Sequence, residues 1–381
     1  MKNKSFYFWI FFTILYSCTD EINPLPPNDE GEGDDQIVQI LAGEYNSFFL
    51  KDNGDLYAVG ENSSGQLGNN STEDITTPTK IMSDVKEVAS GIAHTLILKK
   101  DGTVWGVGSN HSGQFGDGTD FNSSLIPVKS KVENVKTISA GGSTSFFLTE
   151  DGKLWGTGRN DYGQLGIPDD IYNKKTPALI SEDVSDVSNS GSHTLFLKTN
   201  GDTYKMGIDT LVEGVNEDEY TYKLVSHPYV IERDVRNIYA NGLASMMIKN
   251  DNTLWVRGYN TRCFGLGPDA PIDVKKSTYV ISDILQVSTG LFHSMVIKSD
   301  STVWVTGLNF DGQLGIEDTT MRTNVFIASN FGKASLISAG DGYSLFVKDG
   351  KIWGVGDNSH HQLSPSEQQK FTEPVLIELE D

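Results

Sequence analysis

Cysteine is almost absent from this chain of 381 residues, which contains only Cys18 and Cys263. At most one disulfide could form within the chain, and none could form if Cys18 carried a modification. A folded domain must therefore be stabilised by packing. Cys263 has only Arg262 as a basic neighbour in the sequence, so we interpret Cys263 as a structural cysteine rather than a nucleophile.

Long apolar runs are also missing. The most apolar block extends over eleven residues from Phe6 to Tyr16, which is too short to span a bilayer comfortably. Lys2 and Lys4 precede this block, and a basic start followed by a short apolar segment is typical of a secretory signal peptide. We therefore predict a signal peptide over residues 1–17, with an N-terminal membrane anchor as the alternative.

Positive charge is scarce, because 30 lysine and arginine residues stand against 51 aspartate and glutamate residues, giving a formal net charge of −21. Such a chain repels phosphate backbones, so nucleic acid is excluded as a predicted partner. The sequence also contains no Gly-x-Ser-x-Gly motif, no phosphate-cradling glycine loop and no paired carboxylates at a recognisable spacing. We therefore predict that the protein is not an enzyme and uses no cofactor or metal.

Glycine, by contrast, is abundant, with 39 residues, and much of it recurs at a fixed period. In most units an Asp-Gly or Asn-Gly pair follows an apolar run, as at Asp101-Gly102, and an aromatic residue comes three positions after the turn residue. The aromatic residues are separated by 48 to 51 positions and are Tyr57, Trp105, Trp155, Tyr204, Trp255, Trp304 and Trp353. A period this regular indicates repeated supersecondary units.

The residues of each unit indicate how the units stack. Asp-Gly between two strand-like runs predicts a β-hairpin with a type I′ turn. The apolar run before the turn is continuous, as at Leu96–Leu98, so both faces of that strand must be buried. Prolines in the fourth predicted strand indicate an outer edge strand; they are Pro78, Pro127, Pro177 and Pro374.

These features predict an all-β fold over residues 37–381, namely a seven-bladed β-propeller with about 50 residues per repeat and four antiparallel strands per blade. An open β-solenoid is the alternative. The last predicted strand, Pro374–Leu379, has the character of an outer strand, whereas the first, Ile37–Ala42, has that of an inner one. We predict that these two ends join in one mixed blade that closes the ring.

The combined motif G-x-x-H-S/T, D-G-x-x-W and G-x-N-x-x-G-Q-L-G resembles the repeat of the regulator of chromosome condensation family, over residues 37–381. One set of matching residues is Gly91, His94, Trp105, Gly108, Asn110, Gly113, Gln114 and Gly116. The resemblance implies a seven-bladed propeller used mainly for protein–protein contact. The founding member of the family is a nucleotide exchange factor for a Ras-like GTPase, and we find no residues that carry this activity over. A secreted bacterial relative caps β-lactamases with the loops of one propeller face.

Three histidines occupy matched positions of alternate repeats, at His94, His193 and His293. Zinc would require its ligands to converge within about 2.1 Å of one point. Because these histidines belong to the repeat pattern and lie in separate units, we predict structural histidines, each bonded within its own blade.

The stretch Leu15-Tyr16-Ser17-Cys18 resembles a bacterial lipobox, although Tyr16 is bulkier than the usual residue. The resemblance implies cleavage before Cys18 and lipidation of its thiol. Residues 18–36 contain three prolines and seven acids and are predicted to form an acidic tether. Thr19-Asp20-Glu21 resembles the export signal of some surface lipoproteins of the Bacteroides group. We therefore predict a lipid anchor in the outer membrane and exposure at the cell surface.

Candidate partner-binding residues lie between the asparagine and glycine of each N-x-x-G loop, where the repeat imposes no structural demand. The candidates from these loops are His111, Asp161, Tyr162, Phe310 and Asp311. The fourth unit lacks the G-Q-L-G segment, and its acidic, tyrosine-rich replacement adds Tyr220 and Tyr222, read either as a drifted loop or as a protruding contact loop. We predict a surface that binds another protein, with recognition of an extracellular glycan as the alternative.

Overall fold

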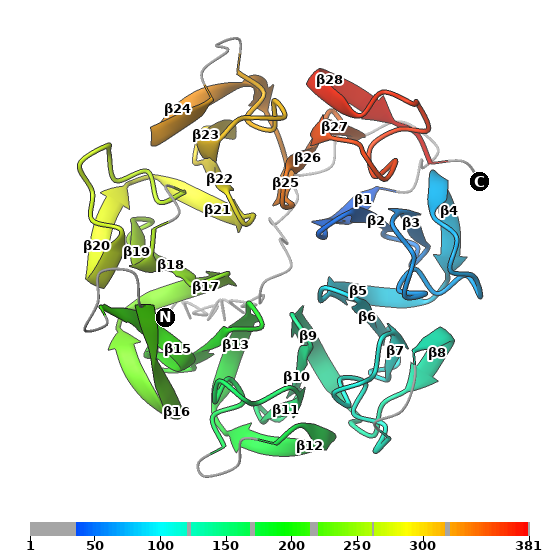
Figure 1. The fold of residues 1–381 in the computed structure, drawn as a ribbon, viewed down its shortest axis with the longest axis vertical. Coiled ribbons are helices and arrows are strands. Elements are labelled where there is room, and N and C mark those ends of the chain that lie inside the picture. The colour runs from blue at the N-terminus through cyan, green and yellow to red at the C-terminus, as the bar shows by residue number, and fades with distance from the viewer. Residues whose placement is uncertain are drawn as a thin grey trace, which may run out of the picture.

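Seven four-stranded antiparallel sheets surround a central axis in the computed structural model of the protein (Figure 1). The structure describes residues 36–119, 123–167, 172–213, 220–260, 263–316 and 321–379, and only the backbone of residues 210–213 and 220–222. Each sheet forms one blade, so the predicted all-β, seven-bladed propeller with four antiparallel strands per blade is confirmed. The segments assigned to the signal peptide and nearly all of the tether, with Cys18, lie outside the described residues.

The first four blades are built from consecutive strands. Blade 1 contains β1 (Ile37–Ala42), β2 (Asn46–Lys51), β3 (Leu56–Gly60) and β4 (Ile75–Met82). Blade 2 contains β5 (Val85–Ser90), β6 (His94–Lys99), β7 (Val104–Gly108) and β8 (Ser124–Lys129). Blade 3 contains β9 (Val135–Gly141), β10 (Thr144–Thr149), β11 (Leu154–Gly158) and β12 (Lys174–Ser181). Blade 4 contains β13 (Val184–Asn189), β14 (His193–Lys198), β15 (Thr203–Glu213) and β16 (Tyr220–Glu232).

The last three blades follow the same plan. Blade 5 contains β17 (Val235–Asn241), β18 (Ala244–Lys249), β19 (Leu254–Tyr259) and β20 (Asp273–Ile281). Blade 6 contains β21 (Ile284–Thr289), β22 (His293–Lys298), β23 (Thr302–Leu308) and β24 (Arg322–Lys333). Blade 7 contains β25 (Leu336–Ala339), β26 (Tyr343–Lys348), β27 (Lys351–Asp357) and β28 (Lys370–Ile377). The predicted proline-bearing strands β4, β8, β12 and β28 are all outermost, as expected for residues that cannot donate to a further strand.

The antiparallel register gives the ring two different faces. Because Asn46 at the start of β2 pairs with Gly60 at the end of β3, the turn at residues 43–45 and the loop at residues 61–74 emerge on the same side. We call this side, with its equivalents in the other blades, the loop face. The opposite side carries the short β2–β3 turns and the connections between blades, and we call it the turn face.

The core lies between the blades, and the second strand of each blade is buried on both sides. In β2, Phe48 belongs to a cluster with Val85 and Ile97 of blade 2. Its neighbour Phe49 belongs to a cluster with Leu336 and Leu345 of blade 7. Alternate side chains therefore pack against opposite neighbours, which explains why the apolar run is continuous.

The hairpin turns differ from the type I′ prediction. Only Gly102 of the Asp101-Gly102 pair has positive φ, at 80°, and its N–H donates to the carbonyl of Lys99 at 3.0 Å. This arrangement is a type I turn followed by a left-handed glycine, which produces a three-residue loop. Asn252 and Ser301 adopt the same left-handed conformation, at φ 65° and 69°, so the turn tolerates both replacements.

The predicted mixed blade is wrong. β1 pairs only with β2, and β28 pairs only with β27, because each repeat of about 50 residues begins and ends in a connection between blades. The ring instead closes side to side: the N–H of Ala42 donates to Ser338 Oγ at 2.9 Å, and the Tyr343 hydroxyl donates to the carbonyl of Asn46 at 2.5 Å. The described part of the chain contains no helix long and apolar enough to cross a membrane.

Candidate functional site: the loop face of the propeller

The asparagine and glutamine of the repeat motif organise the long loops of blades 1, 2, 3, 6 and 7 on the loop face. In blade 1, Asn62 Oδ1 accepts a hydrogen bond from the N–H of Leu67 at 2.9 Å, and its Nδ2 donates to the carbonyls of Ser71 and Glu73 at 3.0 Å. Gln66 Oε1 accepts from the N–H of Ser64 at 2.9 Å. Both amides are buried, so the motif satisfies the loop backbone internally.

The apolar end of the same motif fixes each loop to the following blade. Leu165, at the end of the blade 3 loop, packs in one cluster with Met206 of blade 4. A Cβ added at Gly68, in the blade 1 loop, would lie 3.4 Å from Val107 of β7 in blade 2. The loops are therefore fixed to the ring, and the two residues between asparagine and glycine are free of the motif's own contacts.

The repeat histidines join neighbouring blades. His94 Nε2 lies 3.0 Å from Ser145 Oγ of blade 3, and the equivalent bonds are His193–Ser245 at 3.0 Å and His293–Ser344 at 2.8 Å. For His94 and His293, the prediction that each histidine bonds within its own blade is wrong, because the ring nitrogen points across the blade interface. His193 bonds in both directions, since its Nδ1 also lies 3.0 Å from Ser190 Oγ of its own blade. Burial lowers the pKa values of His94 and His293 to about 4, so both rings are neutral at pH 7. Within the described ranges, no group of three or more metal-ligating side chains occurs.

Large exposed apolar side chains are divided unequally between the faces. Those on the loop face are Tyr45, Ile92, Tyr172, Ile272, Phe292, Phe310 and Met321. The remainder lie on outermost strands and are Ile126, Leu179, Leu224, Tyr279, Val325 and Leu376. None of the described turn-face residues belongs to this class. Exposed apolar side chains gathered on one face mark a candidate interaction surface.

Three of these residues occupy the tips of turns between first and second strands, near the axis. They are Tyr45, Ile92 and Phe292, with exposed fractions of 37%, 61% and 39%, and we call them the inner apolar residues. Beside them, an axial cavity of about 460 Å³ reaches the loop face, where Gly43, Ile92 and Leu291 line it.

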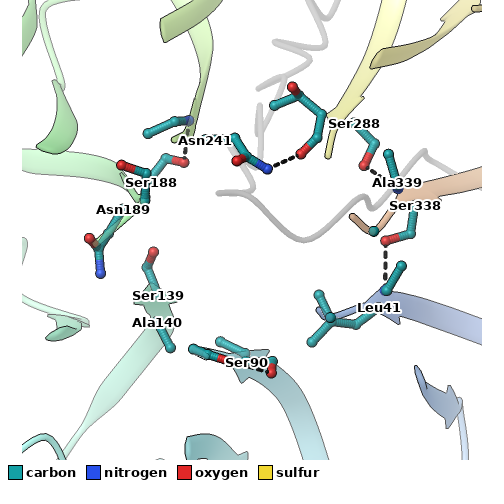
Figure 2. Close-up of a pocket in the computed structure, with 18 of the residues that line it drawn as sticks. Leu41, Ser90, Ser139, Ala140, Ser188, Asn189, Asn241, Ser288, Ser338 and Ala339 are labelled. Atoms are coloured by element: carbon teal, nitrogen blue, oxygen red, sulfur yellow. Dashed lines mark hydrogen bonds between the residues drawn. The ribbon is translucent and has the colours of Figure 1, made fainter. Parts of the chain in front are cut away.

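Residues of the innermost strands line the axial cavity, and serines stand there among apolar residues such as Leu41, Ala140 and Ala339 (Figure 2). The hydroxyls of Ser188, Ser288 and Ser338 line it and also accept backbone N–H bonds from the next blade at 2.8 to 2.9 Å. Because the wall hydroxyls hold the blades together, the cavity belongs to the framework of the ring.

Two carboxylates, Glu44 of blade 1 and Asp341 of blade 7, line one side of the cavity. Burial and the nearby Glu44 carboxylate raise the pKa of Asp341 to about 7. Burial and the charge of Glu61 raise the pKa of Glu44. The centre of the loop face therefore combines negative charge with the inner apolar residues, which is a surface suited to a partner with apolar and basic groups.

Comparison with known families agrees with this architecture. The RCC1-like domain matches residues 16–263, which is more than half of the chain. The chain belongs to the RCC1-like domain family. The regulator of chromosome condensation (RCC1) repeat also matches residues 284–313 of this RCC1-like propeller, within blade 6. The family resemblance read from the repeat motif is thus confirmed.

Individual relatives are distant. An RCC1 repeat-containing protein of Dictyostelium discoideum is 23% identical over 212 residues, which cover 51% of this chain and 43% of that protein; the match therefore spans less than half of the relative. Among solved structures, Prp20p from Saccharomyces cerevisiae superposes with a TM-score of 0.74 at 20% identity, covering 87% of each chain. Human WBSCR16 gives 0.70 at 20% identity, over 81% of this chain and 86% of that one. At this identity the two structures establish the RCC1-like fold alone.

The predicted loop residues of the RCC1-like propeller all lie on its loop face, but they do not form one cluster. Asp161 and Tyr162 share a local partner, because Arg159 lies 2.5 Å from the Asp161 carboxylate and 4.9 Å from the centre of the Tyr162 ring. His111 is exposed in the neighbouring blade 2.

Phe310 and Asp311 belong to blade 6, away from the other loop candidates. Phe310 is 54% exposed. Lys370 of blade 7 donates to the Phe310 carbonyl at 3.0 Å and lies 3.8 Å from the Asp311 carboxylate. These contacts fix the blade 6 loop against blade 7 and leave the Phe310 ring exposed.

The fourth repeat does not contain the predicted loop at Tyr220 and Tyr222. Both residues belong to β16, where Tyr220 pairs with Glu213 and Tyr222 pairs with Leu211. The extra residues continue β15 and β16 as a long hairpin because alternating β-prone residues can pair across it. The side chains of these two tyrosines lie outside the described residues.

Sequence reasoning missed the inner apolar residues of the RCC1-like propeller. Their signal was an apolar residue in the turn that precedes the histidine position, as at Ile92 and Phe292. The repeat requires no apolar side chain at such a turn tip, so the residue type was informative there. Cys263, in contrast, is buried with 1% of its surface exposed, in the core between blades 5 and 6.

Proposed function

We propose that this RCC1-like propeller is a non-catalytic scaffold, lipid-anchored at the cell envelope, that binds another protein through its loop face. The observation that carries the proposal is the distribution of exposed apolar side chains: off the outermost strands, the described ones all lie on the loop face. Exposed aromatic and aliphatic anchors on a rigid platform are typical of protein-binding surfaces. Prp20p is described by its binding to Gsp1p and histones, which supports a protein as the ligand of a related propeller.

The path of the chain supports the proposed orientation on an anchor. β1 runs from Ile37 on the turn face to Ala42 on the loop face. A tether ending at residue 36 therefore joins the ring on the turn face, and the loop face lies on the far side. With Cys18 lipidated, the binding surface is on the side of the ring opposite to the attachment point.

Removing the inner apolar residues should weaken partner binding without unfolding the ring. For the triple variant Tyr45→Ala, Ile92→Ala and Phe292→Ala, we expect at least a thirtyfold loss of affinity, since loss of an interface hot spot typically costs about 2 kcal/mol or more. The measurement is capture of proteins from solubilised native envelopes by the tagged full chain, followed by titration of the captured protein.

The matched control removes similar side chains from outermost strands, with the variants Ile126→Ala, Leu179→Ala and Tyr279→Ala, which are 56%, 46% and 49% exposed. The control should bind normally. A folded inner triple variant that binds at full strength, while Tyr162→Ala with Phe310→Ala loses binding, would move the contact to the outer loops. Loss of binding in the control alone would reject the loop face.

The anchor has its own test. Cys18→Ala should move the protein from the membrane fraction to the soluble fraction, because lipid chains contribute about 0.8 kcal/mol per buried CH₂ and the variant cannot be acylated. The control is Cys263→Ala, whose thiol is buried in the core. Salt-resistant membrane association of the Cys18→Ala protein would show that another element anchors it.

A further inference from the structure

At the turn face, blade 3 differs from the other six blades in the residue that ends its second strand. The second strand of each blade ends in lysine everywhere except in blade 3. The lysines are Lys51, Lys99, Lys198, Lys249, Lys298 and Lys348. In four blades the ammonium lies 4.2 to 6.0 Å from the centre of the repeat aromatic ring, where it covers that ring by a cation–π contact.

In blade 3 the corresponding residue is Thr149, and the ring it should cover is Trp155. The Thr149 hydroxyl is held within its own turn, 2.6 Å from an Asp151 carboxylate oxygen and 3.0 Å from the carbonyl of Lys153. Its short side chain cannot reach over the indole as a lysine does. One side of the Trp155 ring is therefore left without the lysine cover that four of the other repeat aromatics have.

Trp155 also lacks the usual acceptor for its indole N–H. In blades 2, 5 and 6 the indole donates to a threonine two positions earlier, at 3.1, 2.9 and 3.1 Å. Lys153 occupies this position in blade 3, and a lysine side chain has no acceptor. Within the described part of the chain, the indole N–H of Trp155 has no other hydrogen-bond partner.

A third departure opens space beside the same ring. The connection from β8 to β9 comprises residues 130–134, whereas the connection from β4 to β5 comprises residues 83–84. The longer connection stands beside Trp155 and encloses a cleft of about 660 Å³. The cleft has an apolar wall of Trp155, Val132 and Pro177, and its polar lining includes Asn134 and Lys131.

Charges around this cleft, which we call the Trp155 cleft, are paired. Asp151 lies 2.5 Å from Lys153. Glu133 lies 3.7 Å from Lys129, and Glu150 lies 3.9 Å from Lys86. Each of these carboxylates already has an ammonium partner, and two lysines also line the cleft, so the cleft offers a cation no unpaired carboxylate. A neutral ligand with many hydroxyls would find both donors and acceptors.

We propose that the Trp155 cleft binds a pyranose ring of a neutral glycan. A pyranose has an apolar face of C–H groups that can lie on the uncovered indole, and hydroxyls that can bond the indole N–H, the Asn134 amide and the Asp151–Lys153 pair. A volume of this size and an apolar wall with a few fixed polar groups are typical of small-ligand sites. The site lies on the turn face, so it is separate from the protein-binding surface proposed above.

The first test of this site gives blade 3 the lysine that ends the second strand in the other six blades. Thr149→Lys should place a lysine over Trp155 and fill the cleft without disturbing the fold, since six other blades carry lysine there. The probes are the methyl pyranosides of glucose, galactose, mannose and N-acetylglucosamine, with trisaccharides built from them. Saturation-transfer NMR on the full chain should show transfer to at least one probe, and Thr149→Lys should weaken that binding at least tenfold.

Two controls make the result decisive. Lys298→Thr removes the cover of Trp304 in blade 6, where the connection from the preceding blade is short (residues 282–283), and it should create no second site. Trp155→Phe should weaken binding while the variant stays folded by circular dichroism. Absence of transfer to every pyranoside, or equal transfer in wild type and Thr149→Lys, overturns the proposal. So does selective binding of n-butylammonium, which would indicate a cation site. Partner capture by the loop face is a separate measurement and does not depend on the result.

Discussion

Replacing Asp209 by asparagine is expected to lower the free energy of unfolding by about 3–5 kcal/mol, the usual effect of breaking a buried ion pair. Asp209 is 4% exposed. Its carboxylate lies 3.2 Å from Arg257 Nη2 and 3.3 Å from Lys223 Nζ, and it accepts a hydrogen bond from the Tyr229 hydroxyl. The substitution keeps the shape of the side chain but removes the negative charge that contacts these cations.

The buried Lys205 makes this loss large. Its side chain is fully buried, its ammonium donates to the Asp209 carbonyl at 3.1 Å, and it lies 3.8 Å from the carboxylate. Burial lowers the pKa of Lys205 to about 8, while the Asp209 charge acts to raise it. Without that charge, Lys205 and Arg257 repel each other in a poorly solvated site.

The ionic cluster around Asp209 lies at the position that the N-x-x-G-Q-L-G loop occupies in other blades and that blade 4 lacks. In blade 2, the residue before the recurring glycine of the third strand packs on the loop of the preceding blade, as Val107 does on Gly68. Arg257 occupies that position in blade 5, and the blade before it has no G-Q-L-G segment. The pair Asp209–Arg257 therefore joins blades 4 and 5 in place of an apolar contact.

Urea unfolding of the full chain at pH 7 measures the effect. The control is Glu150→Gln, which breaks the exposed pair with Lys86, whose side chains are 63% and 39% exposed; a change below about 1 kcal/mol is expected there. Equal small effects for both variants would show that the cluster contributes no more than a surface pair.

The free energy of unfolding of the wild-type protein is expected to fall between about pH 5 and pH 8 because of Glu87. In the Glu87→Gln variant this fall should be absent. Glu87 is 4% exposed, and its Oε1 accepts bonds from Thr137 Oγ1 at 2.9 Å and from the N–H of Ile138 at 3.2 Å. The equivalent residue of blade 1 is Gln39, whose amide bonds both backbone groups of Val88. A protonated Glu87 resembles that amide.

The direction of the pH effect follows from the titration of Glu87. Burial raises its pKa from 4.5 to about 8 in the folded protein, so the folded state binds a proton that the unfolded chain releases near pH 4.5. The stabilisation is complete below the unfolded pKa and is lost as pH rises through the folded pKa. At 1.36 kcal/mol per unit of pKa difference, the total is on the order of a few kcal/mol.

Unfolding free energies at pH 5, 6, 7 and 8 for both proteins test this expectation. The difference between Glu87→Gln and wild type should grow with pH in favour of the variant. Comparing the two proteins removes contributions common to both, including that of Lys205. A difference that stays constant over the range would contradict a protonated Glu87.

The blade architecture was predictable from sequence because its signals are local. An apolar run, a turn glycine and an aromatic residue lie within about a dozen residues, and their period gives the number of blades. The residue at which each blade begins was not predictable in the same way, because a period of about 50 residues can be divided at any point. The sequence therefore did not show that β1 and β28 belong to different blades.

Contacts between blades were the part that sequence could not provide. The histidine position was recognisable, but the partner of His94 is Ser145, 51 residues away, and nothing in the spacing favours this serine over one in the same blade. The missing loop of repeat four was also visible. Its replacement by Asp209 and Arg257 depends on two strands that lie side by side only in the ring.

The closure of the ring without a mixed blade bears on how the protein is made. Because every blade is one uninterrupted segment, all its strand pairs can form as the chain leaves the ribosome, and these pairings are short-range. The contacts of blade 1 with blade 7 join residues 296 and 297 positions apart. Until Tyr343 is synthesised, the side of blade 1 that carries Phe49 and Ile40 has no neighbour. That flank is the apolar surface exposed for longest during synthesis, and it is where a chaperone or a second nascent chain would bind.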